Sequence, residues 1–208
     1  MKRSILFSFF AAAILFSTSS EAQIPGVGKI KKALPEPIVG VKLGGNFQQI
    51  SGDGWEKTYK PGIVGGIFAG LQKGKMGVQV EGLIKSVNFQ FSAPIPGAPL
   101  PSPIKGVYLD IPLMFEYKII PRIWGQIGPQ YSMMISAKQD GEDIKDAFKP
   151  SEFSGVIGLQ AILPVHITAG VRYVLGFTDI SNTSASTGAA SSAWKSRMIQ
   201  VSVGWRFL

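Results

Sequence analysis

The feature that most constrains the fold is an alternation of apolar and polar residues with a period of two. The closing stretch RMIQVSVGWRFL (197–208) shows it most plainly. Ile199, Val201, Val203 and Trp205 fall on one face, and the residues between them are polar or glycine. Successive side chains of a β-strand point to opposite faces, so this pattern predicts a strand with one apolar face. That face must meet either a protein core or lipid.

The same alternation recurs along the chain and predicts eight strands. Each is about ten residues long or more, which a tilted strand needs to cross a bilayer. Strands of soluble proteins usually have about five or six residues. The predicted strands cover 38–48, 62–72, 76–91, 106–118, 122–136, 153–163, 165–177 and 197–208.

One predicted strand is irregular. In 76–91 the apolar positions are even from Val78 to Ile84 and odd at Phe89 and Phe91. A β-bulge near 85–88 would reconcile the two phases. An outer part of the strand that projects beyond the membrane is the alternative.

Short and long connections between the predicted strands alternate. The short ones are QKGKM (72–76), 119–121 and Pro164, and the long ones are 49–61, 92–105, 137–152 and 178–196. Membrane barrels have short periplasmic turns and long extracellular loops. The sequence therefore predicts an all-β, eight-stranded antiparallel up-and-down transmembrane barrel with both termini on the periplasmic side.

The polar face of the strands distinguishes a membrane barrel from a soluble, lipocalin-like ligand-binding barrel. Glycine is frequent there, as a cramped interior requires and a water-facing surface does not. Those positions are Gly40, Gly44, Gly66, Gly70, Gly128, Gly158, Gly170, Gly176 and Gly204. Aromatic residues near strand ends on the apolar face predict interfacial girdles. They are Phe47, Tyr117, Phe153, Phe177, Trp205 and Phe207.

The N-terminus predicts export. Residues 1–22 have a basic start, an apolar stretch and small residues before a cleavage site, which together indicate a signal peptide cleaved after Ala22. Residues 23–37 read as a periplasmic tether and 38–208 as the barrel domain. No later apolar run has the length of a membrane helix. The expected location is the outer membrane of a Gram-negative bacterium, with outer-membrane lipid as the surrounding partner.

Three segments, GVKLGGNF (40–47), YLDIPLMFEYK (108–118) and GVRYVLGFTDIS (170–181), resemble the PorT-like outer-membrane β-barrel family of Bacteroidota. The resemblance covers about 38–208 and implies a fold and a location. Its name-giving member is tied to secretion and gliding, so an accessory role in such an apparatus is one alternative. Leu208 departs from the usual aromatic C-terminus, so Phe207 would serve as the signal that the barrel-insertion machinery reads in the last strand.

Eight ionisable residues are predicted to face inward, where they could form either a gated ion path or a salt-bridged plug. Eight strands leave room only for side chains, and buried charges must pair, so the plug is favoured over a narrow pore. The set is Lys42, Glu81, Asp110, Glu116, Lys118, His166, Arg172 and Arg206.

The sequence gives no indication of an enzyme or a cofactor. Cysteine is absent, His166 is the sole histidine, and neither a G-x-S-x-G elbow nor a metal-ligand cluster is present. The basic residues are scattered and do not predict a nucleic-acid site. We expect a monomer with a structural or interaction role, meeting envelope proteins or glycans through loops 92–105, 137–152 and 178–196.

Overall fold

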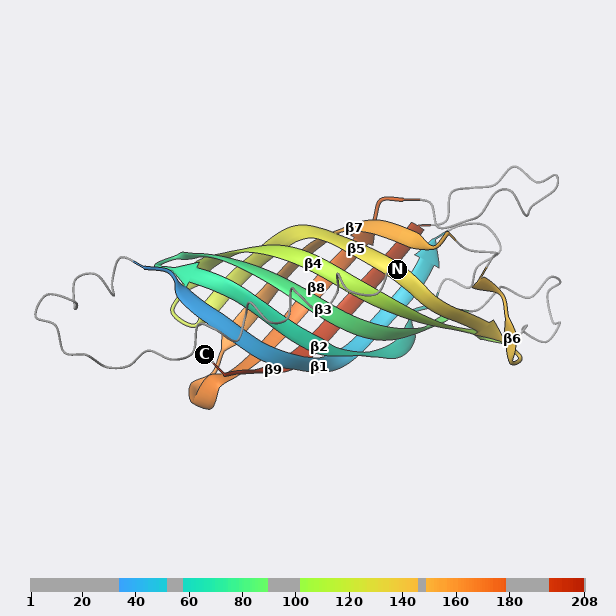
Figure 1. The fold of residues 1–208 in the computed structure, drawn as a ribbon, viewed down its shortest axis with the longest axis horizontal. Helices are drawn as coiled ribbons and strands as arrows, with labels where there is room; N and C mark the ends of the chain where they lie inside the picture. Colours follow the sequence, from blue (N-terminus) through green and yellow to red (C-terminus); the bar gives the residue numbers. More distant parts are fainter. Residues whose placement is uncertain (1–33, 52–57, 90–101, 146–148, 179–194, 208) are drawn as a thin grey trace, which may run out of the picture. The chain divides into compact units, whose positions relative to one another are not determined.

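The computed structural model describes residues 34–51, 58–89, 102–145, 149–178 and 195–207 (Figure 1). These residues form one antiparallel sheet and include a turn of 3₁₀ helix, Pro164–His166. The strands are β1 (Glu36–Ser51), β2 (Lys60–Lys73), β3 (Met76–Phe89), β4 (Ile104–Ile120), β5 (Ile123–Gln139), β6 (Glu142–Asp143), β7 (Ser151–Ile162), β8 (Ile167–Gly176) and β9 (Lys195–Arg206). No helix in the described part of the chain has the length and hydropathy of a membrane-spanning segment.

The long strands close into a barrel. Their order is β4-β3-β2-β1-β9-β8-β7-β5, and a further pairing of β4 with β5 joins the two edges. The predicted eight-stranded antiparallel barrel is therefore confirmed. The two-residue strand β6 pairs only with the outer end of β5, through Lys138 and Gln139, and adds no wall to the barrel.

The register fixes the stagger of the barrel. Starting from Phe47 on β1, we followed the register partner on each next strand once around the barrel. The path returns to β1 at Pro37, ten residues from Phe47 (47 less 37). It passes through Ile199, Tyr173, Ile157, Ile127, Phe115, Val78 and Leu71. Ten residues of stagger over eight strands correspond to a strand tilt of roughly 40° and a backbone radius of about 8 Å. Such an interior is filled by side chains.

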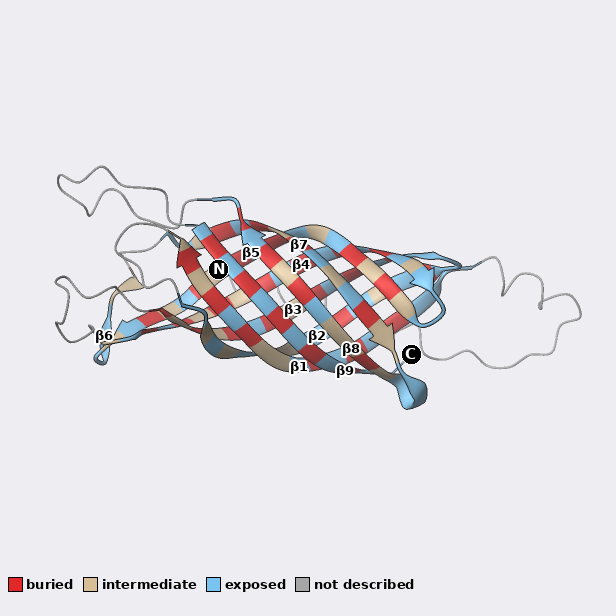
Figure 2. Cartoon of the chain, turned by 180° about the vertical axis from the view of Figure 1, so that it is seen from behind, coloured by how far each residue is buried: buried red, intermediate tan, exposed pale blue. Residues whose placement is uncertain are grey.

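Burial alternates along every long strand (Figure 2). In β9, Met198 is 1% exposed and Gln200 2%, whereas Val201 is 50% exposed and Val203 57%. The interior thus holds most of the polar side chains, and the outer wall is apolar. A soluble barrel has the reverse arrangement, so the outer wall is built for lipid.

The predicted bulge in the third strand is wrong. β3 keeps one phase from Met76 to Phe89, with no register shift against β2 or β4. Phe89 points inward and is 3% exposed. The phase changes instead in β5, where Tyr108 pairs with Met134 but its neighbour Val107 pairs with Ser136.

The connections alternate in length as predicted, with small changes of boundary. The short ones are Gly74–Lys75, Pro121–Arg122 and Leu163–His166, and the long ones are 52–59, 90–103, 140–150 (which contains β6) and 177–194. β8 begins two residues later than predicted, because Pro164–His166 form the 3₁₀ turn. The predicted signal peptide and the predicted tether up to residue 33 lie outside the described residues. β1 begins at Glu36, inside the predicted tether.

The interior also contains apolar side chains that alternation alone did not predict. One cluster lies near the long connections: Ile50, Val87, Phe89, Ile104, Tyr108, Met134 and Ala137. We call it the outer apolar cluster. A second cluster lies deeper in the barrel and contains Met114, Val156, Val174 and Met198. The polar groups described next therefore share the interior with two apolar layers.

Candidate functional site

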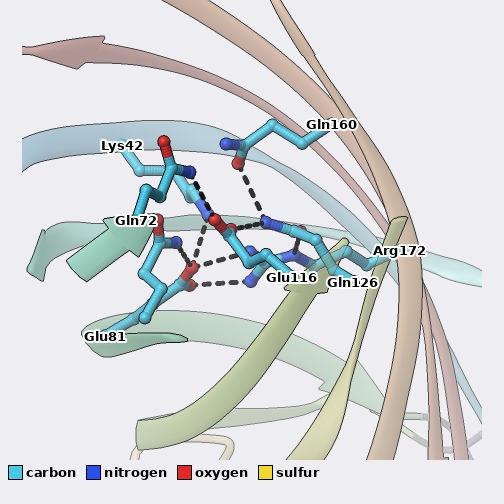
Figure 3. A network of polar contacts seen from close by, with 8 residues as sticks. Lys42, Gln72, Glu81, Glu116, Gln126, Gln160 and Arg172 are labelled. Atoms are coloured by element: carbon cyan, nitrogen blue, oxygen red, sulfur yellow. Dashed lines mark hydrogen bonds and ion pairs between the residues drawn. The ribbon is translucent and has the colours of Figure 1, made fainter. Parts of the chain in front are cut away.

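The centre of the polar interior is a carboxylate held by two cations. Glu81 on β3 accepts hydrogen bonds from Lys42 on β1 at 2.8 Å and from both terminal nitrogens of Arg172 on β8 at 2.6 and 2.7 Å (Figure 3). All three side chains are at most 5% exposed. A bidentate arginine and a lysine neutralise a carboxylate with well-aligned, charge-assisted hydrogen bonds. The group joins strands on opposite sides of the barrel.

Hydrogen bonds extend this ion group toward the short-turn end. Arg172 Nε donates to Gln126 Oε1 at 2.9 Å, and Gln126 Nε2 donates to Glu116 Oε1 at 2.5 Å (Figure 3). Gln72 Nε2 donates to the other oxygen of Glu116 at 2.7 Å, and Arg206 Nη2 donates to Gln72 Oε1 at 2.9 Å. We call this chain from Lys42 to Arg206 the inner polar network. Gln79 and Gln160 join it from the side.

Glycines make room for the long side chains of the inner polar network. Lys42 stands in register with Gly66 on one neighbouring strand and Gly204 on the other. Arg172 stands opposite Gly158, where an added Cβ would lie 2.6 Å from Arg172 Cγ. These glycines were predicted from the sequence as interior positions, and close approach is the physical reason for them.

A second polar group lies between the inner polar network and the outer apolar cluster. Lys85 Nζ is 3.0 Å from Asp110 Oδ2 and 5.1 Å from the centre of the Tyr108 ring. Glu152 accepts a hydrogen bond from the hydroxyl of Ser196. All these residues are buried. Among the described residues the buried charges then balance, with Lys42, Lys85, Arg172 and Arg206 against Glu81, Asp110, Glu116 and Glu152.

Six of the eight predicted inward residues lie in the interior, and five of them belong to the inner polar network. Asp110 is the sixth and pairs with Lys85. The prediction for His166 is wrong, because its backbone has φ 63° in the 3₁₀ turn and its side chain is exposed. Lys118 is half-buried, with Nζ 4.9 Å from the centre of the Trp124 ring.

Sequence reasoning missed two interior charges, Lys85 and Glu152. Lys85 fell in the segment where a bulge was expected, so its face was left open. Glu152 was assigned to the loop 137–152, but it lies in β7, which begins at Ser151. Continued alternation of the inward face could have found both. Lys85 follows the inward-facing Glu81 and Leu83 in steps of two residues, and Glu152 lies two residues before the inward-facing Ser154.

The six aromatic residues predicted for the girdles all point outward and are 44–59% exposed. Corrected for stagger, the register places Tyr117, Trp205 and Phe207 near the short-turn end and Phe47, Phe153 and Phe177 near the long connections. The two levels are roughly 20–25 Å apart, against about 25 Å for the apolar band of a membrane barrel.

The interior leaves some polar atoms without a hydrogen-bond partner. They include Asn46 Oδ1, Gln48 Oε1, Gln200 Nε2 and Asp110 Oδ1. Within the described ranges, His, Cys, Asp and Glu side chains form no group of three or more that could hold a metal ion. The described interior is thus a set of paired charges and amides.

Comparison with known proteins gives one family match and several similar solved structures. A family model described as the outer membrane protein beta-barrel domain matches residues 37–182. The crystal structure of Neisserial surface protein A is similar, with a TM-score of 0.54 and 10% identity over 81% of this chain and 97% of that chain. OprG of Pseudomonas aeruginosa gives a TM-score of 0.47 and 12% identity over 84% and 96% of the two chains. Ail of Yersinia pestis gives 0.45 and 12% over 83% and 99%.

At 10% identity, the likeness to Neisserial surface protein A bears on the fold alone. Among curated protein sequences there is no significant match. The family model, however, spans more than two thirds of the chain and describes the same barrel that the strand register closes. The chain therefore belongs to the outer membrane protein β-barrel domain family.

Proposed function

We propose that this outer-membrane barrel is closed to ions and serves a structural or interaction role rather than transport. The observation that carries the proposal is the inner polar network, which links β1, β2, β3, β4, β5, β8 and β9 across the interior by direct side-chain hydrogen bonds. The outer apolar cluster adds a second barrier at the other end. An ion on a path through the barrel would have to break paired charges and then cross apolar side chains.

Planar-bilayer recording tests this closure. The purified wild-type chain, folded and inserted, should give no stepwise conductance. Glu81→Ala with Arg172→Ala removes the ion group, and Phe89→Ala with Tyr108→Ala thins the outer apolar cluster. Each pair alone should stay silent because the other barrier remains, and the four substitutions together should conduct. Stepwise conductance from the wild type would contradict the plug.

Folding of each variant is checked by heat-modifiability before recording. Folded membrane barrels resist detergent and change gel mobility when they are boiled. The wild type should show this shift and stay with the membrane fraction. Restricting the recordings to variants that shift ensures that conductance reports an opened barrel and not a misfolded one.

The interaction role is proposed for the long connections. Of the three predicted docking loops, 92–105 and 178–196 lie largely outside the described residues, and 137–152 includes the end of β5, the strand β6 and the start of β7. Envelope proteins or surface glycans are the proposed partners. Capture from envelope extracts by the full chain, compared with a chain shortened in 92–101 and 179–194, tests the role. Equal capture by both chains would contradict it.

A secretion or gliding accessory is the second candidate, favoured by the PorT-like resemblance of YLDIPLMFEYK. In the barrel this segment is part of β4 and supplies Asp110 and Glu116 to the interior. The residues that carry the resemblance thus include interior positions of the barrel. Because such positions reflect the fold and not a particular role, we rank the accessory role second. Loss of secretion or gliding in a deletion strain, restored by the wild-type gene, would support it.

Export through a cleaved signal peptide and a non-enzymatic role are also proposed. Mass spectrometry of the mature chain should give an N-terminus at Gln23. The exposed position of His166 on a turn favours a role without catalysis.

A further inference from the structure

The short-turn end of the barrel carries an uneven distribution of charge. The segments 71–76 and 117–123, which contain the β2–β3 and β4–β5 turns, hold Lys73, Lys75, Lys118 and Arg122 and no acidic residue. The third short connection, Leu163–His166, contains neither lysine nor arginine. Among these three connections, the cations are therefore confined to the β2–β3 and β4–β5 turns and the strand ends beside them.

The two basic turns lie side by side. Met76 pairs with Tyr117 at the ends of β3 and β4, and the backbone N–H of Lys118 donates to the carbonyl of Lys75 at 2.8 Å. Lys73, Lys75 and Arg122 are exposed, and Lys118 is half-buried beside Trp124. We call these four cations the basic turn patch.

Large apolar side chains are interleaved with the basic turn patch. Met76 is 54% exposed, Tyr117 46%, and Ile119 and Ile120 56% each. Tyr117 also belongs to the aromatic level near this end, so the cations stand at or just beyond the edge of the apolar wall. Lysine and arginine at such an edge extend their charged ends into the headgroup region while their stems remain in apolar surroundings.

The opposite end of the same strands has a different character. The β5–β6 hairpin carries Lys138 among Asp140, Glu142 and Asp143, and Lys138 stands in register with Asp143. Lys138 therefore has acidic neighbours within its own hairpin. The basic turn patch has no acidic residue in its own segments, but the exposed Glu36 on β1 stands in register with Gln72, the neighbour of Lys73. Four cations beside one exposed carboxylate leave an excess of positive charge that can meet an anion from outside.

We propose that the basic turn patch binds the phosphate groups of anionic phospholipids in the leaflet around the short-turn end. Phospholipid is the partner because the two turns, Gly74–Lys75 and Pro121–Arg122, are only two residues long, so their cations stay close to the edge of the apolar wall. The interleaved isoleucines suit a lipid interface rather than an aqueous partner. Each cation near an anionic surface raises the association constant roughly fivefold.

The test uses the full chain reconstituted in bilayers and compares the association of spin-labelled phosphatidylglycerol with that of phosphatidylcholine. The wild type should prefer phosphatidylglycerol at low ionic strength, and the preference should fall as salt is raised. Lys73→Gln with Lys75→Gln should lower the preference roughly 25-fold at most, and Arg122→Gln alone roughly fivefold. If the double variant does not fold, the single variant Arg122→Gln still tests the proposal.

The matched control is Lys138→Gln with Lys145→Gln, which removes the same charge from the acid-rich β5–β6 hairpin. The backbone N–H of Lys145 donates a hydrogen bond to the side chain of Asp143. The control should keep most of the wild-type preference. Patch variants that retain the preference would overturn the proposal, as would an equal loss in the control, which would show an effect of net charge alone. An unchanged lipid preference would also be the result if the patch served an acidic protein instead.

Discussion

Arg172 makes several buried hydrogen bonds that a substitution would remove. It is 3% exposed, holds both oxygens of Glu81 and also donates to Gln126. Arg172→Gln leaves Glu81 with Lys42 as its cation, and removal of one partner from a buried ion pair typically costs about 3–5 kcal/mol. We expect urea unfolding of the vesicle-embedded barrel to show a loss of that size.

Arg197 provides the matched control for Arg172. It lies on β9 with its side chain exposed, in register with Leu175. Arg197→Gln should change the free energy of unfolding by about 0.5 kcal/mol or less, as exposed substitutions usually do. Equal losses for the two variants would mean that the ion group contributes nothing specific to stability.

Glycine is required at position 158 because the adjacent strand leaves no space for a side chain, and not because of the backbone conformation of Gly158. An added Cβ would lie 2.6 Å from Arg172 Cγ and 2.6 Å from the carbonyl oxygen of Val171. Gly158→Ala should therefore destabilise the barrel by about 1–3 kcal/mol, the usual cost of overpacking. At Gly82 the nearest atom to an added Cβ is 4.0 Å away, so Gly82→Ala should unfold no more readily than the wild type. Unfolding of both variants in urea checks the pair, and a neutral Gly158→Ala would show that Arg172 can shift.

At the scale of single residues, alternation predicted which side chains face inward but not which ones pair. Lys42, Glu81 and Arg172 lie on β1, β3 and β8, and their heights in the barrel depend on the stagger of all the strands between them. No local pattern contains that stagger. The prediction for His166 failed for a different reason, because the left-handed backbone of Val165 and His166 delays the start of β8, and of its alternation, by two residues.

At the scale of elements, β3 shows where alternation becomes ambiguous. Val87 and Phe89 are apolar because they belong to the outer apolar cluster inside the barrel, whereas Val78 and Val80 are apolar because they face outward. An apolar residue in the sequence therefore does not indicate whether its side chain faces lipid or an apolar cluster inside the barrel. The sequence therefore suggested a bulge in β3, while the true register shift in β5, near Ile135, was missed.

Single-cysteine labelling can distinguish the two phases of β3, because the chain contains no cysteine of its own. Spin labels at Ser86 and Asn88 should be accessible to oxygen dissolved in lipid, since these positions face outward. Labels at Val87 and Phe89 should be shielded. In β5 the shielded positions should shift from Met134 to Ala137, a step of three. Shielding at Asn88 combined with exposure at Phe89 would restore the bulge and contradict the continuous register.

At the scale of the whole molecule, the stagger is the quantity that the sequence leaves open. A slip of one residue between neighbouring strands would turn every side chain to the wrong face, so the apolar wall fixes the parity of the stagger but not its size. The barrel has a stagger of ten residues from Phe47 to Pro37. Eight or twelve would preserve the same inward and outward faces while pairing different charges.

Strand tilt measures this stagger directly. With eight strands, a stagger of ten residues gives roughly 40°, against roughly 35° for eight and roughly 46° for twelve. Polarised infrared spectroscopy of the barrel in aligned bilayers reports the mean tilt of the strands, and we expect the value for ten. The contacts among Lys42, Glu81 and Arg172 belong to the register with a stagger of ten. A tilt at either of the other values would contradict that register.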